Sequence, residues 1–438
     1  MEEDQDHTHP HHPVLDLELE DRFLTACKNG DRWHVEECLA SPRVSLHVNT
    51  GLLEASRSGH HEVVQMLIER EDCDINFTDK DGDTALSHSC CCGNYDVVKL
   101  LLSASGIDLN TCDLDKVTPL HKAIANNHLE IVQLLLQHQS LNVNAQNKYG
   151  FTALILAAGM GNFDIVKLLI SVDHVDVNKV ESNSCSALMI ACMHGYCEVA
   201  TLILERQDCD VNIVSHSGYT CLVTACYKNH PSVVAQLLAR ADVDPNWKSE
   251  EGDSLLMTCC ARSYNNIIDL LVGRSDLEIN YTGQRDLSPL MLACIEGNSR
   301  GVSTILCRPD VNVNIVGKDG VTAISLACLQ GNMEIVKMLL ACQDININKM
   351  TIDGVTPFTV SIFKGHTPIT TMLLDRPELV LGHNPNAEYL DNMANQDQGI
   401  DPLHVAAAKG QVEVVKRLIR YESNFREPKN AIIRVATI

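Results

Sequence analysis

The sequence predicts an all-α solenoid of stacked helix-turn-helix units with short hairpin-like tips. An asparagine recurs every 34 residues, and an apolar residue in another phase, from Leu86 to Phe358, keeps the same step. Two markers that share one period indicate a repeat array rather than separate globular domains. Apolar residues make up 45% of the chain and charged residues 21%, which is enough apolar surface to bury a core. The asparagines are Asn76, Asn110, Asn144, Asn178, Asn212, Asn246, Asn280, Asn314 and Asn348.

Residues 111–144 illustrate the elements expected in each unit. Thr118 is placed to cap a first helix that opens with Pro119, where a missing N–H costs nothing. A glycine or asparagine then supplies a turn conformation that most residues resist, and an apolar stripe at residues 131–136 marks the second helix. Neither helix can bury its stripe alone, so the units must stack. The turn residues are Gly93, Asn127, Gly161, Gly195, Gly297, Gly331 and Gly365.

Several motifs of one unit resemble ankyrin repeats. They are TPLH at residues 118–121, the small residues after it, the helix-turn glycine, the EIVQLLL run at 130–136 and the terminal VN at 143–144. DPLHVAAAKG at residues 401–410 is a still closer copy. The resemblance covers residues 21–425 and about twelve units. It implies a recognition surface on the concave side, built from the hairpin tips and the exposed ends of the first helices.

The chain departs from the ankyrin pattern in three places. Its period is 34 residues instead of the family's 33, and the extra residue follows the second helix, which leaves the end of that helix and the curvature open. Pro357 and Pro402 lie 45 residues apart, 11 more than the period, so an insertion at about 383–400 should form a protruding loop. The TPLH histidine, kept as His121 and His404, is replaced in five consecutive units, which should lose a polar tie and gain packing. The replacements are Ile155, Met189, Val223, Met257 and Met291.

The ends of the chain differ from the array. Residues 1–20 are expected to form an acidic, His-rich disordered tail and residues 426–438 a C-terminal tail, with the array at 21–425. The first two repeats are compressed, because Gly30 and Gly59 lie only 29 residues apart. The N-terminus has no signal-peptide pattern, and no apolar run reaches the roughly 18 to 20 residues that cross a bilayer. We therefore expect a soluble monomer in the cytoplasm or nucleus, without membrane insertion.

Charge and cysteine usage narrow the class of function. The net charge of −23 would repel a phosphate backbone, so nucleic acid is not an expected partner. Six of the 19 cysteines share one register position, which predicts buried core packing rather than redox sensing or a metal site. Zinc would need convergent ligands in a CxxC pairing, and the sequence has none. The six are Cys90, Cys192, Cys226, Cys260, Cys294 and Cys328.

The most enzyme-like string is HHEVVQ at residues 60–65. A helical zinc site needs a second histidine where Gln65 stands, so the start of a second helix is the better interpretation. The histidines of the N-terminal tail could hold a metal ion only weakly, and a solvated tail is favoured over a site. We therefore expect no catalytic residue, no metal and no cofactor. The tail histidines are His7, His9, His11 and His12.

We expect a partner protein to bind on the predicted concave side. The residue two places before the helix-turn glycine is often apolar, and several of the scarce aromatic residues fall in the tips. We hypothesise that an extended partner segment anchors there, beside an acidic patch at Glu250, Glu251 and Asp253. The alternative is packing between repeats plus scattered surface apolar residues. The candidate anchors are Tyr149, Phe151, Met193, Tyr219, Tyr227, Ile295, Leu329 and Phe363.

Two minor signals concern the loops and the C-terminus. Asn144 and Asn212 each follow a leucine by eight residues and a valine by one, which resembles the substrate of an oxygen-dependent asparaginyl hydroxylase in ankyrin arrays. The alternative is structural, with the asparagine side chain tying its turn. The C-terminal RVATI could add to a groove that reads chain ends, although Ala436 is not the hydroxyl residue usually wanted there.

The sequence as a whole therefore predicts a protein-binding scaffold or adaptor without catalysis of its own. The alternative is a regulatory subunit or effector that inhibits a target enzyme by occluding it. An enzyme hidden in the array would need a catalytic cluster, and the sequence offers none. The partner is expected to be a protein.

Overall fold

The computed structural model of this chain describes residues 13–41, 47–381 and 402–425. The expected insertion at 383–400, the C-terminal tail at 426–438 and the N-terminal histidines lie outside the described residues. The first helix begins at Pro13, so helical structure starts before the expected array boundary at residue 21. Contacts divide the chain into two compact units, residues 1–224 and 225–438.

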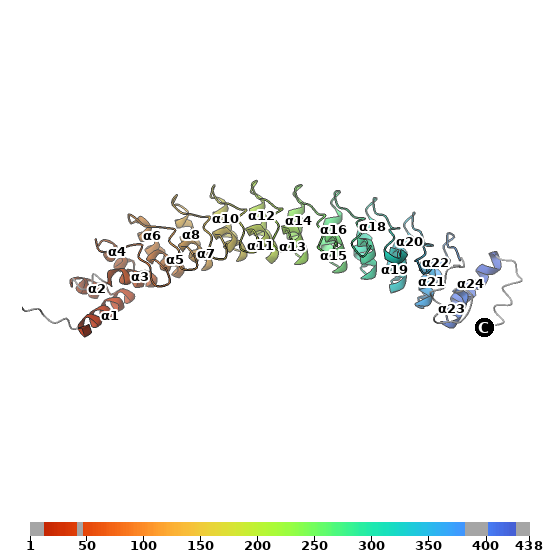
Figure 1. Ribbon diagram of the computed structural model, residues 1–438, viewed down its shortest axis with the longest axis horizontal. Helices are drawn as coiled ribbons and strands as arrows, with labels where there is room; N and C mark the ends of the chain where they lie inside the picture. Colours follow the sequence, from red (N-terminus) through yellow and green to blue (C-terminus); the bar gives the residue numbers. More distant parts are fainter. Residues whose placement is uncertain (1–12, 42–46, 382–401, 426–438) are drawn as a thin grey trace, which may run out of the picture. The chain divides into compact units, whose positions relative to one another are not determined.

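The first unit is a series of helix pairs, numbered along the chain (Figure 1). Within it, each odd-numbered helix packs on the odd-numbered helices beside it and on its own even-numbered partner, as α5 packs on α3, α7 and α6. The bounds are α1 (Pro13–Asn29), α2 (Arg32–Leu39), α3 (Val48–Ser58), α4 (His61–Ile68), α5 (Ala85–Cys92), α6 (Tyr95–Ser103), α7 (Pro119–Ala125), α8 (Leu129–Leu135), α9 (Ala153–Gly159), α10 (Phe163–Ile170), α11 (Ala187–His194) and α12 (Cys197–Leu204).

The second unit repeats this arrangement, after α13 (Cys221–Tyr227), which spans the boundary between the units. Here α17 packs on α15, α19 and its partner α18. The bounds are α14 (Pro231–Leu238), α15 (Leu255–Ala261), α16 (Asn265–Val272), α17 (Pro289–Ile295), α18 (Ser299–Leu306), the 3-10 turn η2 (Lys318–Gly320), α19 (Ala323–Gln330), α20 (Met333–Leu340), α21 (Pro357–Phe363), α22 (Thr367–Leu374), α23 (Pro402–Ala408) and α24 (Val412–Phe425). The pairing confirms the predicted all-α solenoid.

A threonine or serine cap opens most of the first helices. Thr118 accepts a hydrogen bond from the backbone N–H of His121, and the His121 side chain reaches back to the Thr118 backbone, which completes a capping box. The imidazole Nε2 of His121 also lies 3.0 Å from the Phe151 carbonyl oxygen in the next hairpin. Where the histidine is replaced, the threonine or serine cap persists, as in the 3.2 Å bond from the Ile155 N–H to Thr152. Ile155, Met189, Val223, Met257 and Met291 are all buried, as His121 is, so the position belongs to the core whichever residue fills it.

The helix-turn glycines are required for two reasons. Gly93 and Gly331 have φ angles of +79° and +76°, which residues other than glycine rarely adopt. A Cβ atom added at Gly93 would lie 2.6 Å from the His128 ring, and one at Gly331 would lie 2.5 Å from the His366 ring. The turn glycine therefore lets the histidine that caps the second helix of the next repeat pack against the backbone, which sets how closely the two repeats approach.

The core forms between the stacked helices. Helices of seven to nine residues are too short to be stable alone in water, so their stability comes from packing. The six cysteines at the shared register position are buried, as predicted. Burial raises the pKa of the Cys294 and Cys328 thiols to about 12, which keeps them protonated and unreactive at neutral pH. Over the described ranges, every helix is too short or too polar to cross a lipid bilayer.

The loop after the second helix, left open by the sequence, holds an arginine clamp in several repeats. Arg274 forms two bonds with Asp276, at 2.9 and 2.7 Å, and donates to the carbonyl oxygens of Leu238 and Arg240 in the preceding repeat, both at 2.9 Å. Arg308 makes the same set of contacts one repeat later. The arginine satisfies carbonyl groups that a helix end leaves without partners. The arginines with both kinds of contact include Arg206, Arg274, Arg308 and Arg376, and Arg70 and Arg240 form the carboxylate pair two residues along.

Candidate partner-binding face

The predicted anchors of the first unit lie at the hairpin tips and on α11. Tyr149 is 55% exposed and lies under the Lys148 ammonium, whose Nζ is 4.9 Å from the ring centre. Phe151 is half-buried, and its N–H donates to Asn147, whose side chain closes the tip. Met193 and Tyr219 are half-buried. Of these four predicted anchors, Tyr149 is therefore an exposed ring, and the other three combine packing with partial exposure.

The predicted anchors of the second unit come from the last turns of helices. Tyr227 packs edge-on against Trp247, with ring centres 6.3 Å apart, and lies under the Arg262 guanidinium at 5.0 Å. Ile295 and Phe363 are half-buried, and Leu329 is 39% exposed. Aromatic and arginine side chains in partly buried positions are the residue types that most often dominate binding energy.

A second apolar position on the same helix face was missed by sequence reasoning. Leu292, Leu326 and Val360 lie three residues before Ile295, Leu329 and Phe363, so each pair shares one face of its helix. Leu292 and Val360 are half-buried, and Leu326 is 9% exposed. A search for helical i, i+3 spacing behind each predicted anchor would have found them. The second unit thus presents an apolar pair on each of three successive first helices.

The early repeats of the first unit carry polar residues at this register. His88 and Lys122 stand where Leu292 and Leu326 stand later. Lys122 Nζ lies 2.6 Å from Asp83 Oδ1 and 3.0 Å from Asp113 Oδ2, so one ammonium joins the hairpins of two repeats. Burial, which lowers the pKa of Lys122, is outweighed by hydrogen bonds from its ammonium to Asp83 and Asp113, so the pKa is raised overall. Lys122 is therefore a fixed structural cation.

Asp79, Asp83 and His88 form a group that could in principle hold a metal ion, since their ligand atoms all lie within 4.8 Å of one another. His88 Nε2 lies 2.9 Å from Asp79 Oδ2, and an Arg57 Nη2 lies 3.1 Å from the same imidazole nitrogen. The Lys122 ammonium forms an ion pair with Asp83. Two side-chain cations already supply the positive charge that a metal would bring, so this group acts as an internal ion network.

The hairpin tips of the two units use their carboxylates differently. In the first unit, Asp115 pairs with Lys148 at 2.7 Å, and Lys122 pairs with Asp83 and Asp113. In the described part of the second unit, Glu250, Glu251 and Asp253 make no ion pair, although Glu250 and Glu251 are exposed. The predicted acidic patch is therefore open to solvent on one hairpin tip.

The repeated asparagines bridge successive repeats. Asn144 Nδ2 donates to the His174 carbonyl at 2.8 Å, and its Oδ1 accepts from the Asp176 N–H at 2.8 Å. The same two bonds recur for Asn110 and Asn314, among others. The Asn212 N–H donates to Asp210 at 2.9 Å. Because both polar groups of the Asn144 amide are used, the structural interpretation accounts for the period without any modification.

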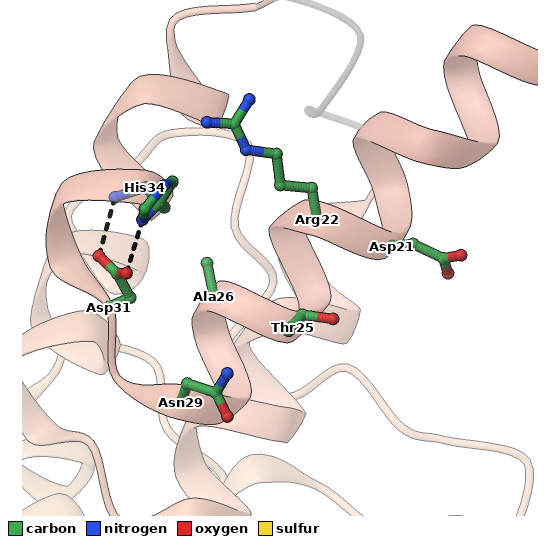
Figure 2. A pocket seen from close by; sticks show the side chains of 7 residues that line it. All are labelled: Asp21, Arg22, Thr25, Ala26, Asn29, Asp31 and His34. Carbon is green, nitrogen blue, oxygen red and sulfur yellow. Dashed lines mark hydrogen bonds and ion pairs between the residues drawn. The ribbon is translucent and has the colours of Figure 1, made fainter.

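A hollow between α1 and α2 brings several titratable groups together (Figure 2). Its carboxylate–imidazole pair, Asp31 and His34, is the cap of α2, and hydrogen bonds from the His34 backbone and side chain lower the pKa of Asp31. Arg22 pairs with Glu37 at 2.6 Å. Thr25 points away from the His34 ring (Figure 2), so these lining residues present no activated nucleophile.

The zinc-like string at residues 60–65 is the start of a second helix, α4. His60 precedes it and lies 2.8 Å, through Nε2, from the Lys28 carbonyl oxygen of the preceding repeat. Glu62 falls in the first turn of α4, where the helix dipole favours a negative charge. The structural interpretation of this string is confirmed.

Comparison with known families matches the same period. The family described as ankyrin repeats (3 copies) matches residues 23–113, 105–181, 173–247, 222–316 and 290–389, and the family described as ankyrin repeat matches residues 398–428. A search of curated proteins finds no match. Ankyrin repeats are a protein-binding module that typically carries no catalysis. Since these matches cover most of the chain, it belongs to the ankyrin-repeat family.

Proposed function

We propose that this protein is a scaffold or adaptor without catalytic activity, which binds a segment of a partner protein along the first helices and hairpin tips. The observation that carries the proposal is the apolar pair repeated on α17, α19 and α21, at Leu292 and Ile295, Leu326 and Leu329, and Val360 and Phe363. An apolar stripe repeated at one register offers one apolar contact per repeat to an extended chain.

In the first unit, the proposed anchors are Tyr149, Phe151, Met193 and Tyr219, and in the second they are Tyr227, Ile295, Leu329 and Phe363. Each unit supplies its own set, so the proposal can be tested in one unit at a time. A scaffold of this kind is expected in the cytoplasm or nucleus, since all 19 cysteines are free thiols.

The test is a Tyr227→Glu, Phe363→Glu double variant of the full chain. Proteins captured from cell extract by the wild type would be compared with those captured by the variant, by quantitative mass spectrometry. We expect the specific partner to be lost at least tenfold, because two desolvated anchors become charged. Circular dichroism checks that helicity is intact.

Met333→Glu is the matched control, because Met333 is 42% exposed but opens the second helix α20. A glutamate at a helix start is tolerated by the helix dipole. Capture that survives the double variant with intact helicity, or that is lost equally in the control, would contradict the proposed binding face.

Hydroxylation at Asn144 and Asn212 stays a second proposal, on the modification of the loops rather than on the function. The bonded amide of Asn144 means that a hydroxylase must open the loop to reach it. Mass spectrometry of the protein from animal cells should find one added oxygen on the peptides that carry these asparagines. If neither peptide carries the added oxygen in cells grown under normal oxygen, the hydroxylation proposal is wrong.

A further inference from the structure

The second unit combines two features in chain order. An acidic tip, Glu250 to Asp253, precedes α15, and apolar pairs then follow on α17, α19 and α21. Both glutamates are exposed, and among the described residues they form no ion pair. The nearest positive side chains in this repeat are already engaged, since Lys248 pairs with Glu278 at 3.2 Å and Arg262 lies over the Tyr227 ring.

The charge of the tip is unbalanced. Glu250, Glu251 and Asp253 contribute three negative charges, and among the described residues no lysine or arginine forms an ion pair with them. In the next two tips, by contrast, Arg285 stands beside Asp286 and Lys318 beside Asp319, so each is neutral. The most strongly charged of these tips therefore lies at one end of the apolar series.

The spacing of repeats limits what kind of chain could meet these features in order. Adjacent packed helices lie about 8–10 Å apart. A polyproline-II segment rises about 3.1 Å per residue, so three residues span about 9.3 Å and return to the same face. Every third side chain of such a segment would meet one apolar pair per repeat.

We propose, building on the proposed function, that the partner segment is bipartite: a lysine- or arginine-rich end that meets the acidic tip, followed at three-residue intervals by apolar side chains that pack on α17, α19 and α21. Charge complementarity fixes which end of the segment lies at Glu250 and Glu251, and steers the encounter. The three apolar contacts supply the affinity, because they remove apolar surface from water.

The experiment uses synthetic fluorescent peptides and the full chain, with binding followed by anisotropy at low salt. One peptide is Lys-Lys-Pro-Leu-Ser-Pro-Leu-Ser-Pro-Leu, a second has the same composition in reverse order, and a third replaces both lysines by glutamates. We expect one of the two lysine peptides to bind at least tenfold more tightly than the glutamate peptide, and its affinity to fall as salt rises.

Two variants locate the contacts. Glu250→Lys with Glu251→Lys should weaken the preferred lysine peptide about tenfold and strengthen the glutamate peptide, since the sign of the tip is reversed. Leu329→Asp should abolish binding of both. Glu334→Lys, an exposed charge change on α20, is the matched control and should alter neither.

The outcomes separate this inference from the proposed function. Equal binding of lysine and glutamate peptides, or no binding of any peptide, would overturn the bipartite partner. In that case, loss of the captured protein in the Tyr227→Glu, Phe363→Glu variant would still support the proposed binding face. Tight lysine-peptide binding that Glu250→Lys with Glu251→Lys leaves unchanged would also overturn the inference, because the charge contact would then lie elsewhere.

Discussion

Two stretches of the array use one helix register for opposite purposes. In residues 79–125 of the first unit, His88 and Lys122 fill it and bond to hairpin carboxylates. In residues 287–363 of the second, Leu292, Leu326 and Val360 fill it. The partners change together, because Leu287 and Gly317 stand where Asp83 and Asp113 stand earlier. Since each repeat contacts only its neighbours, polarity can invert locally without changing the fold.

The loops after the second helices differ between the same stretches. Arg274 and Arg308 clamp the preceding repeat in the second unit, and Arg206 does so near the end of the first, whereas Ala104, His138 and Val172 occupy the equivalent position in the repeats before it. The repeats around Lys122 are therefore joined by ion pairs at the hairpins, and the repeats that carry the clamp by arginines in the loop after the second helix. In the late repeats the first-helix face is apolar at this register, as the proposed binding face requires.

The largest effect is expected from Lys122→Met in the first unit. The change leaves Asp83 and Asp113 facing each other without their shared cation and should cost about 3 kcal/mol, as when one partner of a buried pair is removed. Hydrogen exchange read by mass spectrometry on residues 84–125 measures the local loss, which a whole-chain transition would blur. Lys99→Met, at an exposed position of α6, is the control. Equal effects of the two changes would mean that the ion pairs do not join the repeats.

The reciprocal change is Leu326→Lys in the second unit. Leu326 is 9% exposed, and the positions equivalent to Asp83 and Asp113 hold Leu287 and Gly317 instead of carboxylates. The new ammonium would therefore be unpaired, at a cost of about 2 kcal/mol. Adding Leu287→Asp should recover part of that loss, because it recreates the early ion pair. Exchange of residues 321–340 is the measurement, and a double variant no better than Leu326→Lys would show that the two stretches are not interchangeable.

A smaller effect is expected from Arg274→Gln. The change removes a two-bond contact with Asp276 and two bonds to carbonyl groups of the preceding repeat, at about 1.5 kcal/mol for a loop that is partly exposed. His138→Ala, at the equivalent position of the first unit, should change little. Faster exchange at residues 272–280 in the first variant alone would support the difference between the loops; equal responses would remove it.

The smallest effect is an acid dependence confined to the first unit. Burial raises the pKa of Asp113 but is outweighed by hydrogen bonds from the Val117 N–H and the Lys122 ammonium, so its pKa lies below 3.8, and that of Asp79 is lowered too. A lowered folded-state pKa gives stability that is present above about pH 4 and is lost as pH falls through the folded value. Below pH 4 the free energy of local opening of residues 79–125, measured by hydrogen exchange, should fall by no more than about 1 kcal/mol. A wild type and a Lys122→Met variant with the same acid profile would exclude this linkage.

Part of the site could be predicted from the sequence, and part could not. The period placed Leu329 and Tyr149 on the exposed side of their repeats because register alone fixes the face of a helix or the tip of a hairpin. It did not show that Tyr219 and Met193 are half-buried, since their exposure depends on how closely the next repeat packs. The sequence argument considered one exposed position in each first helix, that of Leu329, and so overlooked Leu326 three residues earlier on the same face.

The sequence by itself determined the period, the helix pairs, the caps such as Thr118 and the core position of the cysteines, since these follow from propensity and from spacing within one repeat. Only the tertiary structure decided that Lys122 joins two hairpins, that Asn144 bonds across to residues 174 and 176, and that Arg274 caps the preceding repeat. The reason is that these contacts join atoms of neighbouring repeats, and a period names the neighbouring repeat without fixing which of its atoms come within hydrogen-bond distance.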